Sequence, residues 1–511
     1  MPRRALLPAL VTLAIMLATA AQAAGFERLG QYGIGLPGSG AGQVTQPSGV
    51  AVSPDGTVAV SDIANQRVAV FSQDGPFLRA FGKDVAVGGG EGFEICTSAC
   101  KAGAPGTAAG ELTTPFSLAA GSNEIYVSEG GNHRISVFSF QGQFLRAFGA
   151  DVGGAGVNVC TTICAAGTGG VGAGQMAAPA GLALDASGRL YVGEIGTNRV
   201  DVFDPQTGTF LLGFGKNVGG AGVHTCTAVC GPGVADGTPG SLSIPYGLSI
   251  APNGDVHVAE NGGGRVSVFS GAGNFVHLFG SAGEGSGQLA APSGVAADGQ
   301  GNDYVGDMGN HRLAVFVPGG FRAYGLDVIP GGLVAPEVCT TLCKAGESGY
   351  GIGEFNSPWG IGLDCRESVY VGTIGRVDKW GEPGAGSPPC TPAQAAPAKP
   401  SNAFRFGKLR RNRKKGIVTV EVTVPGPGSL VARAGRKLKT VAPQPAAART
   451  LRVRIRAIRK GLRALNRKGR LKGTLRVTFT PTNGDPNTKS RKVTLLKKLR
   501  KSKKKRKTAG R

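Results

Sequence analysis

The chain has 511 residues, of which 87 are glycine and 6% are aromatic, and its formal net charge at pH 7 is +24. The glycines fall at turns between short apolar runs, which excludes a collagen-like or wholly disordered chain and indicates a turn-rich β protein. After residue 20 no apolar run is long enough for a membrane-spanning helix, and the length allows two or more domains.

Residues 1–24 have the pattern of a secretory signal peptide. Arg3 and Arg4 precede an apolar run over residues 5–20, and small residues at 21–23 supply a cleavage site. The arginine pair lacks the rest of a twin-arginine pattern, so we expect ordinary Sec export. We therefore expect a secreted, extracellular protein that is associated with the cell envelope.

Residues 125–149 contain a pattern that recurs over residues 25–381. An apolar run with a carboxylate is followed by Asn-His-Arg, a second apolar run, a glycine turn and a run that ends in Phe-Gly. A short strand containing Pro-x-Gly or a close variant precedes it. Four short strands with tight turns are typical of one propeller blade. The copies begin at Pro47, Pro115, Pro179, Pro245, Pro292 and Pro358.

This pattern closely resembles the NHL repeat of six-bladed β-propellers, and the resemblance implies an all-β fold. The sixth copy stops after Trp380 without its last strand, whereas residues 26–33 have that strand's sequence. Pairing the two segments would leave no open sheet edge. We predict a six-bladed β-propeller over residues 25–381, closed by an N-terminal strand.

Five of the copies carry a carboxylate five residues before an arginine. The pairs could form a ring of catalytic carboxylates, or each could brace two strand ends through a charge-assisted hydrogen bond. Because the spacing is the same in every copy, we favour the structural brace. The brace pairs are Asp62/Arg67, Glu129/Arg134, Glu194/Arg199, Glu260/Arg265 and Asp307/Arg312.

Ten cysteines indicate an oxidising compartment and five disulfides. Four Cys-x-x-x-Cys pairs lie on links of 29 to 32 residues between copies, whereas the links of 11 and 13 residues carry none. A redox motif needs two intervening residues, so it is not indicated; shared metal sites are the alternative. The expected bonds are Cys96–Cys100, Cys160–Cys164, Cys226–Cys230, Cys339–Cys343 and Cys365–Cys390.

The four long links, here called the inserts, are residues 84–110, 151–174, 217–240 and 327–353. In an up-and-down blade they rise from the same end of the sheets as the Asn-x-Arg turns, and we call this end the insert face. Both chain exits lie on the opposite face. Links this long are commonly functional. We predict a binding surface on the insert face, with candidate residues His224, Asn132, His133, Asn310 and His311.

Beyond the propeller, residues 382–402 are rich in Pro and Ala and are expected to form a semi-rigid linker. Residues 403–496 contain alternating apolar and polar runs, which predict a small, basic β-sandwich-like domain with a short helical patch around residues 457–466. Residues 497–511 form a lysine-rich tail that we expect to be disordered.

The charge is divided unequally along the chain. Residues 401–511 hold 36 Lys/Arg and two acidic residues, or +34, which leaves 20 basic and 30 acidic residues elsewhere, or −10. Such a domain attracts polyanions. For an exported protein we expect anionic cell-envelope polymers as partners, with nucleic acid as the alternative. RNA-binding NHL propellers use a basic propeller face, and this propeller is acidic.

We predict an exported, non-enzymatic binding or scaffold protein. Its insert face would bind a protein or glycan ligand, and its basic domain would hold the chain to the envelope. The first alternative is a propeller lyase or hydrolase acting on a secreted small molecule or polysaccharide. The peptidyl-hydroxyglycine and streptogramin lyases share this architecture and rely on inward histidines or carboxylates. We find no such off-pattern set here, so we expect no catalytic residue, metal or cofactor. Polyanion or nucleic-acid binding through the basic domain is a further alternative.

Overall fold

A computed structural model describes residues 26–332, 335–382, 404–424, 428–435, 437–441, 449–481 and 487–499. The chain divides into two compact units, Met1–Ala393 and Gln394–Arg511, and each is described by itself. The predicted signal peptide, nearly all of the predicted linker and most of the predicted tail lie outside the described residues. In the described part, no helix is both long and apolar enough to cross a bilayer.

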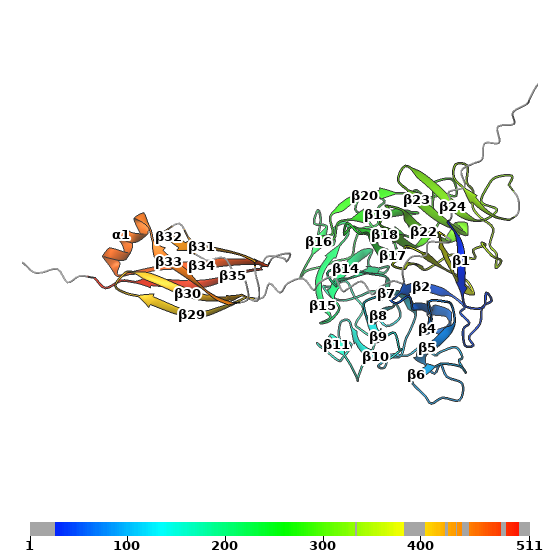
Figure 1. Cartoon of the computed structure of the whole chain (residues 1–511), viewed down its shortest axis with the longest axis horizontal. Coiled ribbons are helices and arrows are strands. Elements are labelled where there is room, and N and C mark those ends of the chain that lie inside the picture. Colours follow the sequence, from blue (N-terminus) through cyan, green and yellow to red (C-terminus); the bar gives the residue numbers. More distant parts are fainter. Residues whose placement is uncertain are drawn as a thin grey trace, which may run out of the picture. The chain divides into compact units, whose positions relative to one another are not determined.

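The fold is all-β, and the described part of the first unit contains six antiparallel sheets arranged as blades around an axis (Figure 1). Blades one to three are β2 (Pro47–Val52), β3 (Val58–Asp62), β4 (Arg67–Phe71) and β5 (Phe77–Lys83); β7 (Pro115–Ala120), β8 (Glu124–Glu129), β9 (Arg134–Ser139) and β10 (Phe144–Phe148); and β12 (Pro179–Leu184), β13 (Leu190–Glu194), β14 (Arg199–Asp204) and β15 (Thr209–Phe214).

Blades four to six follow in the same order along the chain. They are β17 (Pro245–Ile250), β18 (Val256–Glu260), β19 (Arg265–Phe269) and β20 (Phe275–Phe279); β21 (Pro292–Ala297), β22 (Asp303–Asp307), β23 (Arg312–Val317) and β24 (Gly320–Leu326); and β26 (Ile361–Leu363), β27 (Val369–Thr373), β28 (Arg376–Gly381) and β1 (Glu27–Tyr32). Single 3₁₀ turns, Ile63–Asn65 and Met308–Asn310, follow β3 and β22.

The N-terminal strand completes blade six. Strand β1 pairs antiparallel with β28, with Arg28 opposite Trp380. Just before β1, the Phe26 ring packs against Tyr304, Tyr324 and Trp380, with ring centroids 5.1–6.1 Å apart. The predicted pairing of the two chain segments is confirmed, and it gives β28 a partner on the side that would otherwise be open.

Four blades carry a fifth, outermost strand that the sequence did not indicate. Each is a short segment of an insert that ends at the first cysteine of its pair: β6 (Phe93–Cys96), β11 (Val159–Cys160), β16 (Thr225–Cys226) and β25 (Pro336–Cys339). The inserts therefore cover the outer edges of blades one, two, three and five, a common protection of exposed sheet edges.

Glycine in the Pro-x-Gly motif allows the first strands to meet around the axis. A Cβ atom on Gly247 would lie 2.2 Å from the Ser293 carbonyl oxygen, and one on Gly294 would lie 2.5 Å from the Trp359 carbonyl oxygen. Any side chain at these positions would push neighbouring blades apart. The repeated glycine therefore sets the tight centre of the ring.

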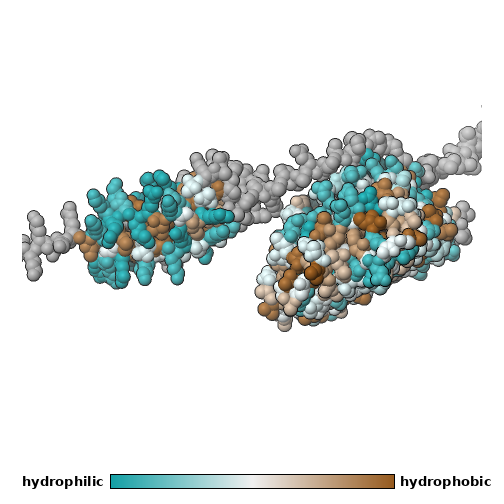
Figure 2. Space-filling view, turned by 90° about the horizontal axis from the view of Figure 1, so that it is seen from below, coloured by the Kyte–Doolittle hydropathy of each residue, from teal (hydrophilic) through white to brown (hydrophobic). Residues whose placement is uncertain are grey.

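The second unit has two sheets that share one core. One sheet has the order β29 (Arg405–Asn412), β30 (Ile417–Val424), β33 (Arg449–Ala457), β32 (Leu438–Val441), and the other β31 (Gly428–Ala434), β34 (Arg470–Pro481), β35 (Asn487–Leu496). Val420, Val453 and Val477 are fully buried in that core, and Leu465 of helix α1 (Arg459–Lys468) joins them. Hydrophilic side chains cover most of the visible surface of this unit (Figure 2).

Candidate functional site

The brace pairs lie where two strands of a blade meet at the insert face. Every pair forms an ion contact, and the carboxylates are fully buried. The N–O distance is 2.8 Å for Glu129/Arg134, Glu260/Arg265 and Asp307/Arg312, 3.5 Å for Asp62/Arg67 and 3.7 Å for Glu194/Arg199. Burial raises the pKa of Asp62 and of Asp307.

Four of the five brace arginines, all except Arg265, also hydrogen-bond the insert that follows them. Arg134 Nη1 donates to the Ala165 carbonyl at 2.9 Å, and Arg312 Nη1 donates to the Lys344 carbonyl at 2.8 Å. Arg67 and Arg199 make the same bond, and in all four blades the acceptor is the residue directly after the second cysteine. The same arginines hold carbonyls of the preceding link. The arginine thus fastens the base of the insert to the blade.

The residue two positions after the arginine depends on which acid is present. Blades with Asp carry an alanine there, Ala69 or Ala314. Two blades with Glu, whose side chain is one methylene longer, carry a serine there. Its hydroxyl donates a hydrogen bond to the carboxylate: Ser136 to Glu129 and Ser267 to Glu260. Blade three has an acid instead, Asp201.

Blade three therefore holds two carboxylates and one arginine in a fully buried group. Asp201 Oδ2 lies 2.7 Å from Arg199 Nη2, while Glu194 Oε1 is buried and receives no hydrogen bond from any described residue. In blades two and four a serine hydroxyl supplies that donor, whereas here the nearby acid Asp201 favours a proton held between the two carboxyl groups. Burial raises the pKa of Glu194 well above its usual value and that of Asp201 to about 6.

The candidate asparagines are structural partners of the brace. Asn132 Nδ2 donates to Glu129 at 2.6 Å and to the Gly106 carbonyl at 2.8 Å, and the side chain is buried. Asn310 Nδ2 makes the equivalent bonds to Asp307 and Gly283. Neither amide is directed toward solvent.

His133 and His311 connect neighbouring blades. Their Nδ1 atoms accept from the backbone N–H of Ala178 and of Ser357, both at 3.2 Å. Gln66 and Asn198 do the same in blades one and three. Burial lowers the pKa of His311.

His224 is exposed on the third insert, where Nδ1 accepts from the Asn217 N–H at 3.1 Å. The five candidate binding residues are spread over blade two, blade five and the third insert, and the structure does not bring them together into one site.

Four of the expected disulfides are confirmed: Cys96–Cys100, Cys160–Cys164, Cys226–Cys230 and Cys339–Cys343. Cys390, and with it the expected Cys365–Cys390 bond, lies outside the described residues. Each blade with a disulfide has a small residue opposite the first cysteine, namely Ala80, Ala147, Gly213 or Ala323, whereas blade four has Leu278 at that position. The blade sheet is therefore shaped to seat the disulfide.

An exposed aliphatic side chain stands at the tip of three disulfide loops, directly before the second cysteine. Ile163 is 85%, Val229 is 84% and Leu342 is 79% exposed. The first insert has Ala99 at this position. A single exposed aliphatic side chain is common on protein surfaces. Three at equivalent positions of disulfide-bonded loops on one face are unusual and indicate a contact surface.

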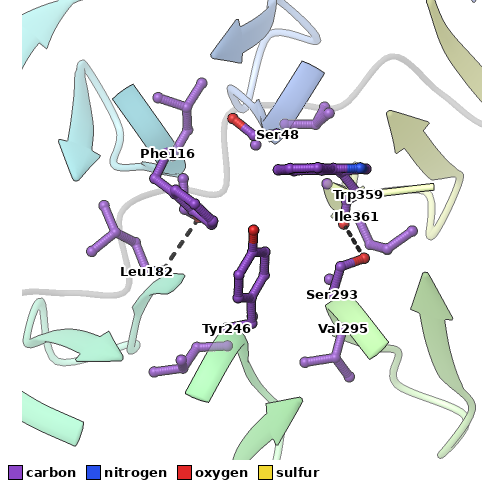
Figure 3. Close-up of a pocket in the computed structure, with 16 residues that line it drawn as sticks. Ser48, Phe116, Leu182, Tyr246, Ser293, Val295, Trp359 and Ile361 are labelled. Carbon is purple, nitrogen blue, oxygen red and sulfur yellow. Dashed lines mark hydrogen bonds between the residues drawn. The ribbon is translucent and has the colours of Figure 1, made fainter. Parts of the chain in front are cut away.

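The axis on the insert face ends in an aromatic cluster that sequence reasoning missed. Phe116, Tyr246 and Trp359 point toward one another (Figure 3), with ring centroids 4.6–6.3 Å apart. Burial raises the pKa of Tyr246. The sequence carried a signal for this cluster. The residue directly after the first proline of each copy alternates between small and aromatic around the ring: Ser48, Phe116, Ala180, Tyr246, Ser293 and Trp359.

The axial cavity among these residues measures about 30 Å³, which leaves room for water and not for a substrate. At the other end of the axis, a cavity of about 310 Å³ is lined by aliphatic and small residues of all six first strands. Within the described part of the chain, no three or more His, Cys, Asp or Glu side chains gather closely enough to hold a metal ion.

Comparison of the sequence with known families and proteins finds the same repeat. The model of the NHL repeat matches residues 45–71. The protein brain tumor of Drosophila melanogaster is 29% identical over 177 residues, which cover 34% of this chain and 13% of that protein. Among solved structures, streptogramin B lyase is 14% identical with a TM-score of 0.39, covering 70% of this chain and 98% of its own. The WD40 propeller domain of Doa1 is 11% identical with a TM-score of 0.39, covering 70% and 97%.

Proposed function

Because this chain is an NHL-repeat β-propeller protein, we propose that it is an exported, non-enzymatic binding protein. Its insert face holds a protein ligand, and its basic C-terminal domain attaches it to anionic polymers of the cell envelope. Propellers of this repeat family mediate protein binding.

The observation that carries the proposal is the set of exposed aliphatic tips, Ile163, Val229 and Leu342. Aliphatic side chains on rigid supports bind by filling apolar pockets, which proteins offer more than glycans do. Each tip is fixed by its disulfide and by the brace arginine at the base of its insert, so little conformational entropy is lost on binding.

The small number of charged residues in the inserts also supports a protein partner. The four inserts together contain eight Asp/Glu and two Lys/Arg residues. A face with few charges and repeated apolar tips is typical of the core of a protein interface, from which charged residues are depleted.

Capture experiments with the full chain test this assignment. The I163S/V229S/L342S variant is expected to lose a ligand that the wild type captures from envelope extract. V276S/L211S removes exposed aliphatics that lie outside the inserts and should keep the ligand. Equal capture by both variants would refute the assignment, and a ligand that survives protease but not glycosidase would make the partner a glycan.

The envelope attachment has its own test. Cells that produce the chain truncated after Lys399 should release it into the medium, while the full chain stays with the cells until the salt concentration is raised. N-terminal sequencing of the released protein should begin near residue 25. Retention of the truncated chain on cells would show that attachment does not need the basic domain.

A further inference from the structure

The outer surface of the sheet β31-β34-β35 carries only basic and uncharged side chains. Leu475, Val477 and Phe479 of β34 point into the core, so the alternate residues Lys472 and Arg476 point outward and are exposed. The other exposed cations of this surface are Arg433, Arg470 and Lys492. None of the three strands contains Asp or Glu. We call this surface the β34 face.

Two arginines of the β34 face lie directly opposite each other. The register places Arg433 of β31 across from Arg476 of β34, so their Cβ atoms are about 5 Å apart. Like charges in this position are destabilising. The three strands contribute no carboxylate that could relieve this repulsion, and an anion between the two guanidinium groups would relieve it.

Hydroxyl groups surround this arginine pair. Ser490 lies opposite Arg476, and Thr474 lies opposite Lys492. Both Ser490 and Thr474 are exposed. The face thus offers guanidinium, ammonium and hydroxyl donors at the spacings of a sheet, about 4.8 Å between strands and about 6.8 Å along a strand.

The opposite sheet also carries arginines, but its charge is partly balanced. Arg452, Arg454 and Arg456 are exposed along β33. Glu421 Oε1 lies between two cations, 4.0 Å from Arg452 Nε and 3.9 Å from Arg410 Nε. A carboxylate in the middle of this surface opposes binding of a polyanion. It therefore provides a matched control surface on the same domain.

Two further cations of β35 are used inside the domain. Lys489 Nζ donates to the Phe404 carbonyl at 2.9 Å, and Arg491 Nη1 donates to the Gly407 carbonyl at 2.6 Å. Both also lie over phenylalanine rings, within 5.9 Å of the centroids. They hold β29 to the neighbouring sheet edge and are not part of the β34 face.

From these observations we infer that the β34 face binds a linear polymer of phosphodiester groups without bases. Paired guanidinium groups with adjacent hydroxyl donors suit phosphate oxygens. The described outward residues of these strands include no aromatic side chain, so bases would find no stacking surface. The inference rests on the proposed attachment of the basic domain to an envelope polymer, and it names the surface and the ligand chemistry.

Titration of the full chain with poly(glycerol phosphate) at several salt concentrations tests the inference. R433Q/R476Q is expected to weaken binding about tenfold or more and to reduce the slope of log K against log salt by about 2. R452Q/R454Q removes the same charge from the control surface and should change affinity less than twofold. Single-stranded DNA and hyaluronate of matched charge should bind more weakly than poly(glycerol phosphate).

The outcomes separate this inference from the broader proposal. If the wild type binds none of the polymers, the envelope attachment itself fails. If it binds and the two double variants weaken equally, affinity follows net charge and the assignment to the β34 face is overturned. Tighter binding of DNA or hyaluronate would overturn the ligand chemistry. In the absence of polymer, R433Q/R476Q should raise the melting temperature of the domain because it removes the opposed like charges.

Discussion

The imidazole Nδ1 of His257 in blade four lies 2.7 Å from a carboxylate oxygen of Asp303 in blade five. Both residues depart from the repeat. Tyr126, Tyr191, Tyr304 and Tyr370 stand where His257 stands, and aliphatic residues stand where Asp303 stands. Among the described residues, neither atom has another hydrogen-bond partner. Two off-pattern residues thus form one contact between blades.

We expect Asp303→Val to destabilise the propeller by about 1–3 kcal/mol, because it leaves a buried imidazole N–H without an acceptor. Adding His257→Tyr should recover part of that loss, because it removes the unpaired imidazole and places the tyrosine of four other blades there. Urea unfolding of both variants and of His257→Tyr alone completes a double-mutant cycle. Additive effects would mean that the two side chains do not interact.

The buried pair in blade three predicts a specific pH dependence. The folded-state pKa values of Glu194 and Asp201 are raised, so the folded protein retains a proton that the unfolded chain releases. This bound proton contributes fully to the free energy of unfolding below about pH 4. The contribution is lost as the pH rises through about 6, the pKa of Asp201 in the folded protein. Relative to Asp201→Ser, the wild type should lose about 1.4 kcal/mol per pH unit between those values.

Denaturant unfolding at pH 4, 5, 6 and 7 measures this difference. Asp201→Ser recreates the Glu-with-Ser arrangement of blades two and four, so its own stability should vary less over this range. Parallel pH curves for the wild type and the variant would show that blade three holds no extra proton.

The small residues opposite the first cysteine of each disulfide predict that a larger side chain is not tolerated at these positions. Ala147 is fully buried against Cys160, so Ala147→Leu should cost about 1–3 kcal/mol through overpacking. It should also speed reduction of the Cys160–Cys164 bond by dithiothreitol. Leu278→Ala in blade four, which has no disulfide, is the control and should leave all four reduction rates unchanged. An unchanged rate of reduction in Ala147→Leu would mean that the packing of the insert does not depend on the small residue opposite Cys160.

The closing strand predicts rescue in trans. Deleting residues 26–32 removes the partner of β28 and the Phe26 ring from its aromatic surroundings, so the melting temperature should fall. A synthetic peptide of residues 26–32 should restore it in a concentration-dependent way. A peptide with Phe26→Ala should restore less. No effect of either peptide would indicate that pairing with β28 adds little to stability.

Much of the fold could be read from the sequence because each blade repeats the same local pattern. The Pro-x-Gly openings and the orphan strand at residues 26–33 predicted the strands of the propeller and the pairing of β1 with β28. The fifth strands were missed because segments of two to four residues, such as β11, carry no periodicity.

The candidate binding residues were less predictable. The roles of Asn132 and His133 depend on backbone atoms that only the folded ring brings within reach. By contrast, the pairing of His257 with Asp303, and the aromatic cluster at Phe116, Tyr246 and Trp359, left a signal at aligned repeat positions. Comparing those positions across copies would have found both.

The contact between Arg28 and Asp378 joins residues 350 positions apart. At about 5–20 residues per second, a ribosome needs roughly 20–70 s to make the second residue after the first. The earliest strand of the propeller therefore waits through almost the whole synthesis of the domain before its partner exists. Anything that acts on the nascent chain in that interval meets a ring that has not yet closed.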